Sequence, residues 1–206
     1  MGIVITRTKA LTADSVNVIA HTQTPLAAGN LTLVSTPVTL DTQRRVLFTF
    51  VADETGHSFV VYGTKQGGAS IQETVAGAGI GTVSTLQDFL TVSRVSISAA
   101  ATGAIQVGTN TVGATDWQSI DIFRQPVNIG FSIVLNGTVN YTIQTTNQDV
   151  NALLPAGQIP TTSDLPQFTA LSYTTSGGIT TPAAYFRLQI NSGTGTATLN
   201  YEQAGP

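Results

Sequence analysis

The sequence has 206 residues, of which 41% are hydrophobic and only 9% are charged, with a formal net charge of −3 and no cysteine. The absence of cysteine excludes disulfides, thiolate catalysis and cysteine-ligated zinc. The basic residues are scattered and no apolar run is long enough to cross a bilayer, so neither nucleic acid nor a membrane is an expected partner. A surface this poor in charge repels other copies only weakly, which makes self-association the default expectation.

Residues 1–40 contain short β-like runs separated by polar stretches. Pro25 and Gly29 indicate a loop over residues 23–30. The pattern predicts an extended N-terminal arm together with the first strands. An arm of this kind would contact a neighbouring subunit, and Pro25 and Leu26 are therefore candidate contact residues.

Residues 41–110 are predicted to form the core of a first β domain. Runs of β-branched and aromatic residues over 46–51 and 59–62 flank a polar turn over 53–57, which predicts a β-hairpin. A further strand is expected over 71–75.

The polar turn contains Asp53, Glu54 and His57. Two carboxylates beside an imidazole can bind a metal or relay a proton. A turn also collects solvated polar residues for structural reasons, and the matching turn in the second half has no acid or histidine. We favour the structural interpretation, and expect no catalytic residue, no metal site, no cofactor and no enzymatic activity.

The glycines of Gly77-x-Gly79-x-Gly81 have the spacing of a phosphate-binding loop. Such a loop requires a following helix, whose N-terminal amides hold the phosphate. The next residues, Thr82-Val83-Ser84, show no helical pattern, so the glycines predict a bend.

Residues 111–206 are predicted to form a second β domain, after a small, polar boundary over 109–116. Apolar runs over 131–134 and 141–143 bracket Asn136-Gly137. This dipeptide is typical of a type I′ hairpin turn, which requires positive φ at both central residues.

A long loop is predicted over 147–166, where three prolines interrupt the chain and periodicity is weak. A short helix over 148–154 is the only regular alternative. Unstructured loops of this length are uncommon in compact domains unless they bind something. Four residues of this loop are candidate contact residues: Leu153, Leu154, Ile159 and Leu165.

The stretch 94–107 recurs loosely as 187–201, at an offset of 93 residues (187 minus 94). Each copy has an arginine, alternating apolar and polar residues, a turn containing glycine, and a second alternating run, which is typical of a β-hairpin. The recurrence predicts an all-β protein of two tandem antiparallel β-sandwich or barrel-like domains that arose by internal duplication. The repeated Arg94 and Arg187 would either bridge a carboxylate or shield the edge of a sheet.

Trp117 and Phe123 flank the start of the second half. Packing between the two domains is the favoured role for these rings, and a ligand platform is the alternative.

Several runs carry a resemblance to a known class of protein. They are Gln72-Glu73-Thr74-Val75, 84–98, 137–144, 147–150 and 186–195. Together they resemble a recurrent type of structural protein encoded by tailed bacteriophages, over most of residues 45–203. Residues 1–40 carry no such resemblance.

The resemblance implies a virion protein that is assembled in the host cytoplasm. A capsid decoration or cement protein is the leading expectation: a homotrimer that grips the major capsid protein through the arm or the 147–166 loop. A head-tail connector or a tail component is the alternative within the virion. A carbohydrate- or receptor-binding β module is the alternative from another class, with Trp117, Tyr173 and Tyr185 as the stacking aromatics.

Overall fold

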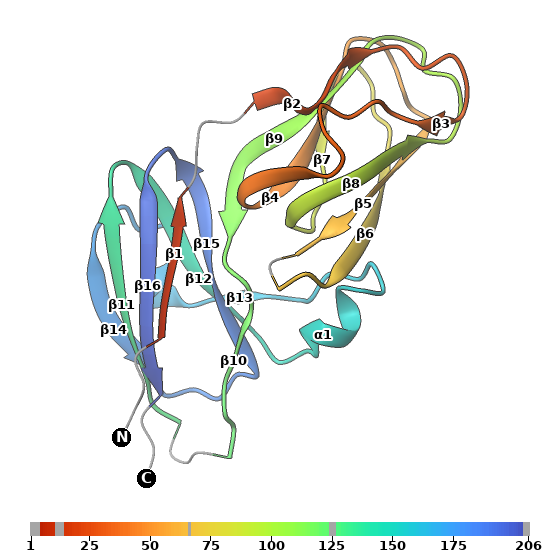
Figure 1. The fold of residues 1–206 in the computed structure, drawn as a ribbon. Coiled ribbons are helices and arrows are strands. Elements are labelled where there is room, and N and C mark those ends of the chain that lie inside the picture. Colours follow the sequence, from red (N-terminus) through yellow and green to blue (C-terminus); the bar gives the residue numbers. More distant parts are fainter. Residues whose placement is uncertain (1–4, 11–14, 66, 124–126, 204–206) are drawn as a thin grey trace. The chain divides into compact units, whose positions relative to one another are not determined.

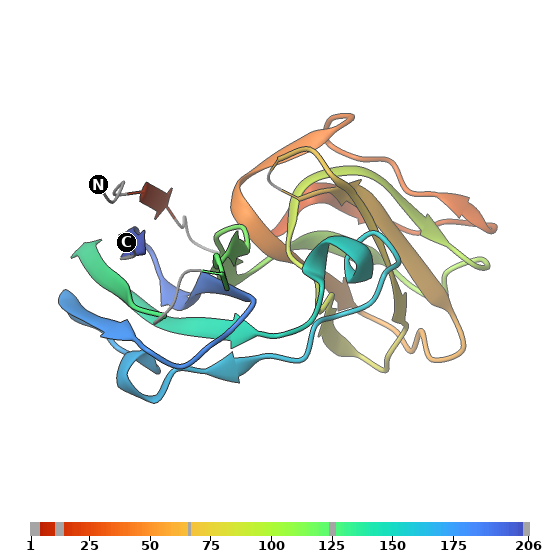
Figure 2. The ribbon, with the colours of Figure 1, turned by 90° about the horizontal axis from the view of Figure 1, so that it is seen from below.

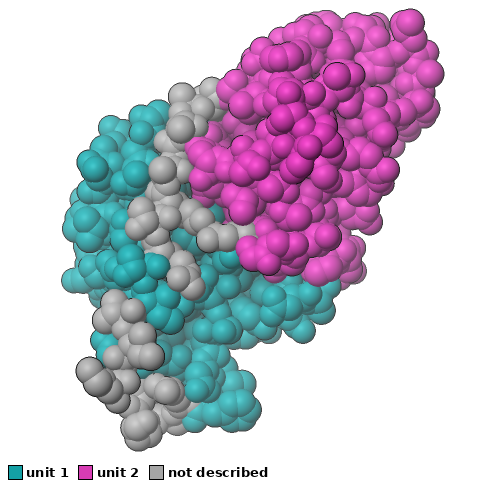
Figure 3. All heavy atoms as spheres, viewed as in Figure 1, with its two compact units in different colours: residues 1–13, 111–153, 160–206 teal, residues 14–110, 154–159 magenta. Residues whose placement is uncertain are grey.

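The computed structural model describes residues 5–10, 15–65, 67–123 and 127–203. Within this part the chain is almost entirely β-strand, and its strand pairs are antiparallel, which confirms the all-β expectation (Figure 1). The described helices are one turn each, and none is long and apolar enough to cross a bilayer. The chain divides into two compact units (Figure 3): unit 1 is 1–13, 111–153 and 160–206, and unit 2 is 14–110 and 154–159.

Unit 1 contains two sheets. The first has the strand order β1-β16-β11-β14, and the second has the order β13-β12-β15, with β10 and the end of β9 also paired to β15 (Figures 1 and 2). Two short helices, α1 (Val150–Leu153) and η1 (Pro166–Phe168), lie in the connections. The strands are β1 (Ile5–Ala10), β10 (Gln118–Ser119), β11 (Ile129–Asn136), β12 (Val139–Thr146), β13 (Ser163–Asp164), β14 (Thr175–Ile179), β15 (Tyr185–Gly193) and β16 (Thr196–Gln203).

Aromatic rings from both sheets form the centre of the unit 1 core. Phe131 on β11 and Phe186 on β15 have ring centroids 5.0 Å apart, and Phe186 lies 4.8 Å from Tyr201 on β16. Phe168 of η1 meets Phe131 edge to face at 5.7 Å. Rings in these geometries stabilise by their mutual orientation in addition to the apolar area that they bury.

Unit 2 is built around the 13-residue strand β4. Near its start β4 pairs with β8, and near its end it pairs with β7. The main strand order is β9-β4-β8-β5-β6, with β2 on β9 and β3 on β8. The strands are β2 (Ser15–Gln23), β3 (Gly29–Asn30), β4 (Val38–Phe50), β5 (Ser58–Thr64), β6 (Ser70–Ala76), β7 (Gly81–Ser84), β8 (Phe89–Ile97) and β9 (Ile105–Ala114), whose last residues belong to unit 1.

A second aromatic cluster lies in the core of unit 2. Phe59 on β5 has its ring centroid 5.0 Å from that of Phe48 and 5.2 Å from that of Phe50, both on β4. All three rings are buried. Strand β5 alternates buried and half-buried residues along its length, as a strand with one face on the core should.

All four predicted hairpins are wrong. The two strands of each predicted hairpin exist, but they are not neighbours: β8 lies between β4 and β5, and β4 lies between β8 and β9. In unit 1, β11 and β12 belong to different sheets, and so do β15 and β16. Alternation and turn residues show where strands start and stop, but they do not show which strand lies alongside.

The predicted type I′ turn at Asn136-Gly137 is also wrong. Gly137 has φ of 85°, but among the described residues Ala170 is the sole non-glycine residue with positive φ. Asn136 is instead the last residue of β11, opposite Thr196. The chain therefore passes from one sheet to the other at Gly137 and Thr138.

The two sheet crossings of unit 1 pack against each other. The Thr194 N–H donates to the Thr138 carbonyl at 2.9 Å. A Cβ atom on Gly193, which has φ of 119°, would lie 2.1 Å from the Thr138 oxygen, and one on Gly195 would lie 2.3 Å from the Asn136 oxygen. Glycine is therefore required here for space and, at Gly193, for backbone conformation.

The same pairing scheme appears in both units. The first strand of each set of four adjoins the last, and the second pairs with the third: β4 with β9 and β5 with β8 in unit 2, and β11 with β16 and β12 with β15 in unit 1. Arg94 and Arg187 hold corresponding places, opposite Tyr62 and Gln144 respectively. The internal duplication itself stays a prediction.

The described part of residues 1–40 is integrated into sheets. Strand β1 pairs with β16 over six residues in unit 1, whereas β2 pairs with β9 and β3 with β8 in unit 2. This differs from an arm that reaches away from the body, because the alternating residues of β1 complete the edge of an existing sheet.

The segment 147–166 is more regular than predicted. Helix α1 falls within the 148–154 alternative, and β13 pairs with β12 through Ser163 and Asp164. Residues 154–159 belong to unit 2, while the flanking residues belong to unit 1.

Substitution of Gly193 by alanine is expected to lower the free energy of unfolding by about 1–3 kcal/mol, because the new Cβ meets the Thr138 carbonyl at a positive φ. Urea unfolding followed by tryptophan fluorescence and circular dichroism measures the change. Gly130→Ala is the matched control in the same unit, since its Cβ would meet nothing closer than 4.0 Å. Equal stabilities of the two variants would contradict the requirement for glycine.

Candidate interaction surface

Three strongly exposed apolar side chains of unit 2 lie on connected loops, and Leu86, which is 57% exposed, lies apart from them between β7 and β8. Leu26 is 90% exposed, Ile80 is 78% exposed and Val51 is 57% exposed. They belong to the loops 24–28, 51–57, 77–81 and 98–104, which we call the loop end of unit 2. Isolated exposed apolar residues are common, but several on hydrogen-bonded loops indicate a contact surface.

Backbone hydrogen bonds join these loops. The Ala101 N–H donates to the Pro25 carbonyl at 2.8 Å, and the Val51 N–H donates to the Ala104 carbonyl at 3.2 Å. The Glu54 N–H donates to the Ala78 carbonyl at 2.9 Å. The apolar side chains are thus carried by loops that hold one another in place, which lowers the entropy lost when a partner binds.

Glu54 is the central side chain of the loop end. It is fully buried, its Oε1 accepts the Gly103 N–H at 2.9 Å, and its Oε2 lies 2.6 Å from His57 Nδ1. Burial raises the pKa of this carboxyl, but hydrogen bonds from His57, Gly103 and Thr102 lower it, and the pKa lies below its ordinary value of 4.5. Glu54 is therefore a carboxylate whose hydrogen bonds connect the loop 51–57 to the loop 98–104.

The other acid of the predicted cluster is also engaged. Asp53 Oδ1 accepts hydrogen bonds from the Thr55 hydroxyl at 2.6 Å and the Thr55 N–H at 2.9 Å, and these two bonds lower the pKa of its carboxyl. In the described part of the chain, no group of three or more histidine and acidic residues is placed to hold a metal ion. Asp53, Glu54 and His57 therefore make hydrogen bonds that stabilise the turn in which they lie.

Small residues are required at the base of the loop end. A Cβ on Gly103 would lie 2.5 Å from the Ala52 Cβ, and one on Gly77 would lie 2.1 Å from the Glu54 carbonyl oxygen. Gly81 begins strand β7, so no helix follows the glycines of 77–81. Gly77 serves close packing of loops, Gly81 has a positive φ of 137°, and the three glycines do not present a phosphate-binding helix.

The six predicted contact residues fall into different environments. Leu26 is the most exposed of them, and the Pro25 beside it is half-buried. Leu154 packs partly buried against the core of unit 2, and Leu165 packs against the core of unit 1. Leu153 is half-buried, and Ile159 is 43% exposed.

Sequence reasoning missed Ile80 and Val51 as surface residues. Val51 ends the apolar run 46–51 that predicts a strand, and Ile80 lies between Gly79 and Gly81 in the stretch that predicts a bend. Their exposure follows from their place beyond the last paired residues, since β4 ends at Phe50 and β7 begins at Gly81.

The repeated arginines stack on aromatic rings. The Arg94 guanidinium carbon lies 3.7 Å from the centroid of the Tyr62 ring, and that of Arg187 lies 4.7 Å from the Trp117 ring. Edge shielding is wrong, because β8 and β15 have neighbours on both sides. The Arg187 Nε also donates to Gln144 Oε1 at 3.0 Å.

The other aromatic candidates are separate features. One face of Trp117 is occupied by Arg187, and Tyr185 is half-buried. Tyr173 is exposed on the connection before β14. Phe123 is 90% exposed, and its packing role between the domains stays a prediction.

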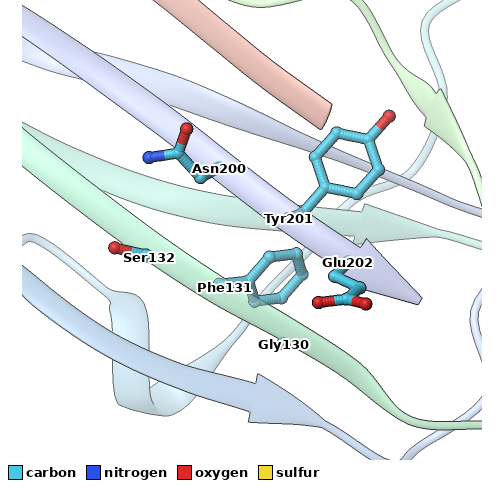
Figure 4. Close-up of a pocket in the computed structure, with 6 residues that line it drawn as sticks. All are labelled: Gly130, Phe131, Ser132, Asn200, Tyr201 and Glu202. Atoms are coloured by element: carbon cyan, nitrogen blue, oxygen red, sulfur yellow. The ribbon is translucent and has the colours of Figure 1, made fainter. Parts of the chain in front are cut away.

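A shallow hollow lies on the first sheet of unit 1. Figure 4 shows its lining on two neighbouring strands, and its volume is ≈ 220 Å³. Asn200 Oδ1 already accepts the Thr6 hydroxyl at 2.7 Å. The hollow is lined by Gly130, Phe131, Ser132, Asn200, Tyr201 and Glu202. This lining contains no nucleophile that is hydrogen-bonded to a base.

No family of known proteins matches the sequence, and no curated protein matches it. Among solved structures, the chain is similar to the major capsid protein P2 from bacteriophage PM2, with 10% sequence identity and a TM-score of 0.23. The similarity covers 98% of this chain and 97% of that chain. A TM-score this low does not identify a common fold and gives no information about function.

Substitution of Glu54 by glutamine is expected to destabilise the protein by about 1–2 kcal/mol at neutral pH, because charge-assisted hydrogen bonds are lost. The folded-state pKa is lowered, so this contribution is complete above the ordinary value of 4.5 and is lost as the pH falls through the folded value. Urea unfolding at a series of pH values measures the difference between wild type and variant.

The difference should shrink as the pH is lowered. The Glu202→Gln variant is the control for general acid effects, since Glu202 is an exposed acid on β16 of unit 1 and lies outside the loop end. A difference for Glu54→Gln that stays constant with pH would contradict a carboxylate that fastens the loops.

Proposed function

We propose that this chain is a non-enzymatic structural protein of a tailed-phage virion, namely a capsid decoration protein that binds the shell formed by the major capsid protein. The observation that carries the proposal is the loop end of unit 2, where Leu26, Val51 and Ile80 are exposed on mutually hydrogen-bonded loops. The sequence resemblance to tailed-phage structural proteins points to the same class.

The chemistry of the loop end suits a protein surface as partner. Full burial of a Leu or Ile side chain is worth about 1.5–3 kcal/mol, so a few such residues give a weak contact per copy. Glu54 lies inside the loop end and contributes no exposed charge, whereas the exposed Asp53 carboxylate of the same loop would have to stay in water at the rim of the contact.

Repetition over a shell makes a weak contact sufficient. Many copies bound to a symmetric lattice, or several joined in one oligomer, gain avidity without a large interface for each copy. A chain with only 9% charged residues also tolerates dense packing of copies on a surface. A homotrimer remains the expected oligomer at the shell.

Two other functions give different outcomes in the same experiments. A connector or tail component would form a ring in the neck or tail of the particle. A carbohydrate-binding module would require an exposed aromatic platform, for which Tyr173 is the accessible ring. The loop end favours the decoration protein, since it offers aliphatic side chains and no aromatic ring.

Cryo-electron microscopy of the phage particle that contains this chain tests the proposal. Density for the chain over the capsid surface is the expected result. Density confined to the neck or tail would overturn the decoration role in favour of a connector. Absence from the particle, together with glycan binding that is lost in Tyr173→Ala, would favour the carbohydrate-binding module.

The Leu26→Ser, Ile80→Ser double variant is expected to bind capsids that lack the chain at least about tenfold more weakly than wild type, since two buried apolar contacts are lost. Co-sedimentation of purified protein with such capsids measures the binding. Val134→Ser is the matched control, because Val134 is 45% exposed on unit 1. Unchanged binding by the double variant, with an unchanged unfolding midpoint, would contradict a role for the loop end.

A further inference from the structure

Strand β14 is an edge of the first sheet of unit 1, and in the described part of the chain no further strand pairs with it. The strand order β1-β16-β11-β14 leaves β1 and β14 at the two edges. An edge strand presents backbone N–H and C=O groups to any further strand, unless charge, proline, a bulge or a covering segment blocks it.

The outward backbone groups of β14 can be assigned. The Gly178 carbonyl accepts a hydrogen bond from Gln167 Nε2 at 3.0 Å, so it points away from β11. Alternate residues of a strand direct their N–H and C=O groups to the same edge, which places the groups of Ser176 and Gly178 outward. The Gln167 side chain is exposed, so a backbone N–H of another strand can take the place of its amide as the donor to the Gly178 carbonyl.

The two edges differ in charge. No charged residue occurs from Leu165 to Phe186, a segment that includes all of β14, whereas β1 carries Arg7 and Lys9. Charged side chains on an edge strand oppose pairing with a like strand. The composition of β1 therefore opposes pairing with a like strand, and the composition of β14 does not.

We propose that β14 pairs with β14 of a second copy of this chain, antiparallel about a two-fold axis at Gly177. In this register Ser176 of each copy lies opposite Gly178 of the other, and each pair exchanges both of its N–H···O=C bonds. Gly177 faces Gly177 at the axis. The contact is self-complementary, as a two-fold interface requires.

The glycines of β14 keep this edge flat. A Cβ on Gly178 would lie 2.6 Å from the Ile129 carbonyl oxygen, and one on Gly177 would lie 2.9 Å from the Phe168 ring. Side chains are thus excluded at both positions by unit 1 itself. The result is an edge whose outward surface consists mainly of backbone, which favours another strand as its occupant.

This contact is independent of the proposed shell contact. It lies on unit 1, uses the backbone and joins copies in pairs, whereas the loop end lies on unit 2 and presents aliphatic side chains. A negative result for the β14 contact therefore does not affect the proposed contact of the loop end, and the reverse also holds.

Sedimentation velocity of the full chain over a range of concentrations tests the proposal. Wild type should contain a species in which copies associate in pairs. Ser176→Lys and Ser176→Pro should each weaken this association at least about tenfold, by placing charge at the edge or by removing an outward N–H. Gln167→Ala should strengthen it, since Gly178 then has no competing donor from Gln167.

Val134→Lys is the matched control, because it adds the same charge to the central strand β11 of the same sheet. It should leave the association unchanged. Pairwise association that persists in both Ser176 variants, or a wild type that shows no pairing at any concentration, would overturn the proposal. Equal loss in the Val134 control would place the contact on the face of the sheet and would overturn it too.

Discussion

Both units depend on the same pairing constraint within a set of four strands. In unit 2 the set is β4, β5, β8 and β9, and in unit 1 it is β11, β12, β15 and β16; in each set the first strand adjoins the last and the second pairs with the third. The constraint prevents the short turns from closing hairpins, so β11 and β12, and likewise β15 and β16, cross from one sheet to the other. Rings from facing sheets then meet in the core, as Phe131 and Phe186 do. The loops gather where the strands end, and the contact surface proposed for unit 2 consists of such loops.

The loop end of unit 2 has a buried carboxylate inside, and exposed aliphatic side chains beside the polar turn of Asp53 and Thr55 outside. Glu54 is buried and holds the loops by hydrogen bonds, while Leu26 and Ile80 extend into solvent. This is the reverse of the usual distribution, in which apolar groups lie inside. A buried carboxylate is tolerable because its oxygens are hydrogen-bonded, and the exposed aliphatic groups are tolerable if a partner covers them.

The sequence was sufficient to predict the class of fold and the places of most strands, because alternation and β-branched residues are local signals. The choice of Leu26 as a contact residue stays a prediction, although its side chain is 90% exposed. The strand partners of Phe48 and Phe131 were not predictable, since pairing depends on residues far away in the chain. Burial of Glu54 was missed for the same reason: its partner Gly103 lies 49 positions further along. Ile80 lies in the stretch that predicts a bend, and the glycines around it give no signal of how exposed its side chain is.

The route of the chain through the two units restricts how the protein can be divided. Unit 1 takes its edge strand β1 from the N-terminus, and unit 2 takes residues 154–159, including the core-packing Leu154, from the second half. A cut between residues 110 and 111 therefore yields no intact half, because the front fragment lacks Leu154 and the rear fragment exposes the edge of β16. Proteolysis or truncation at that junction would give two aggregation-prone pieces in place of two autonomous modules.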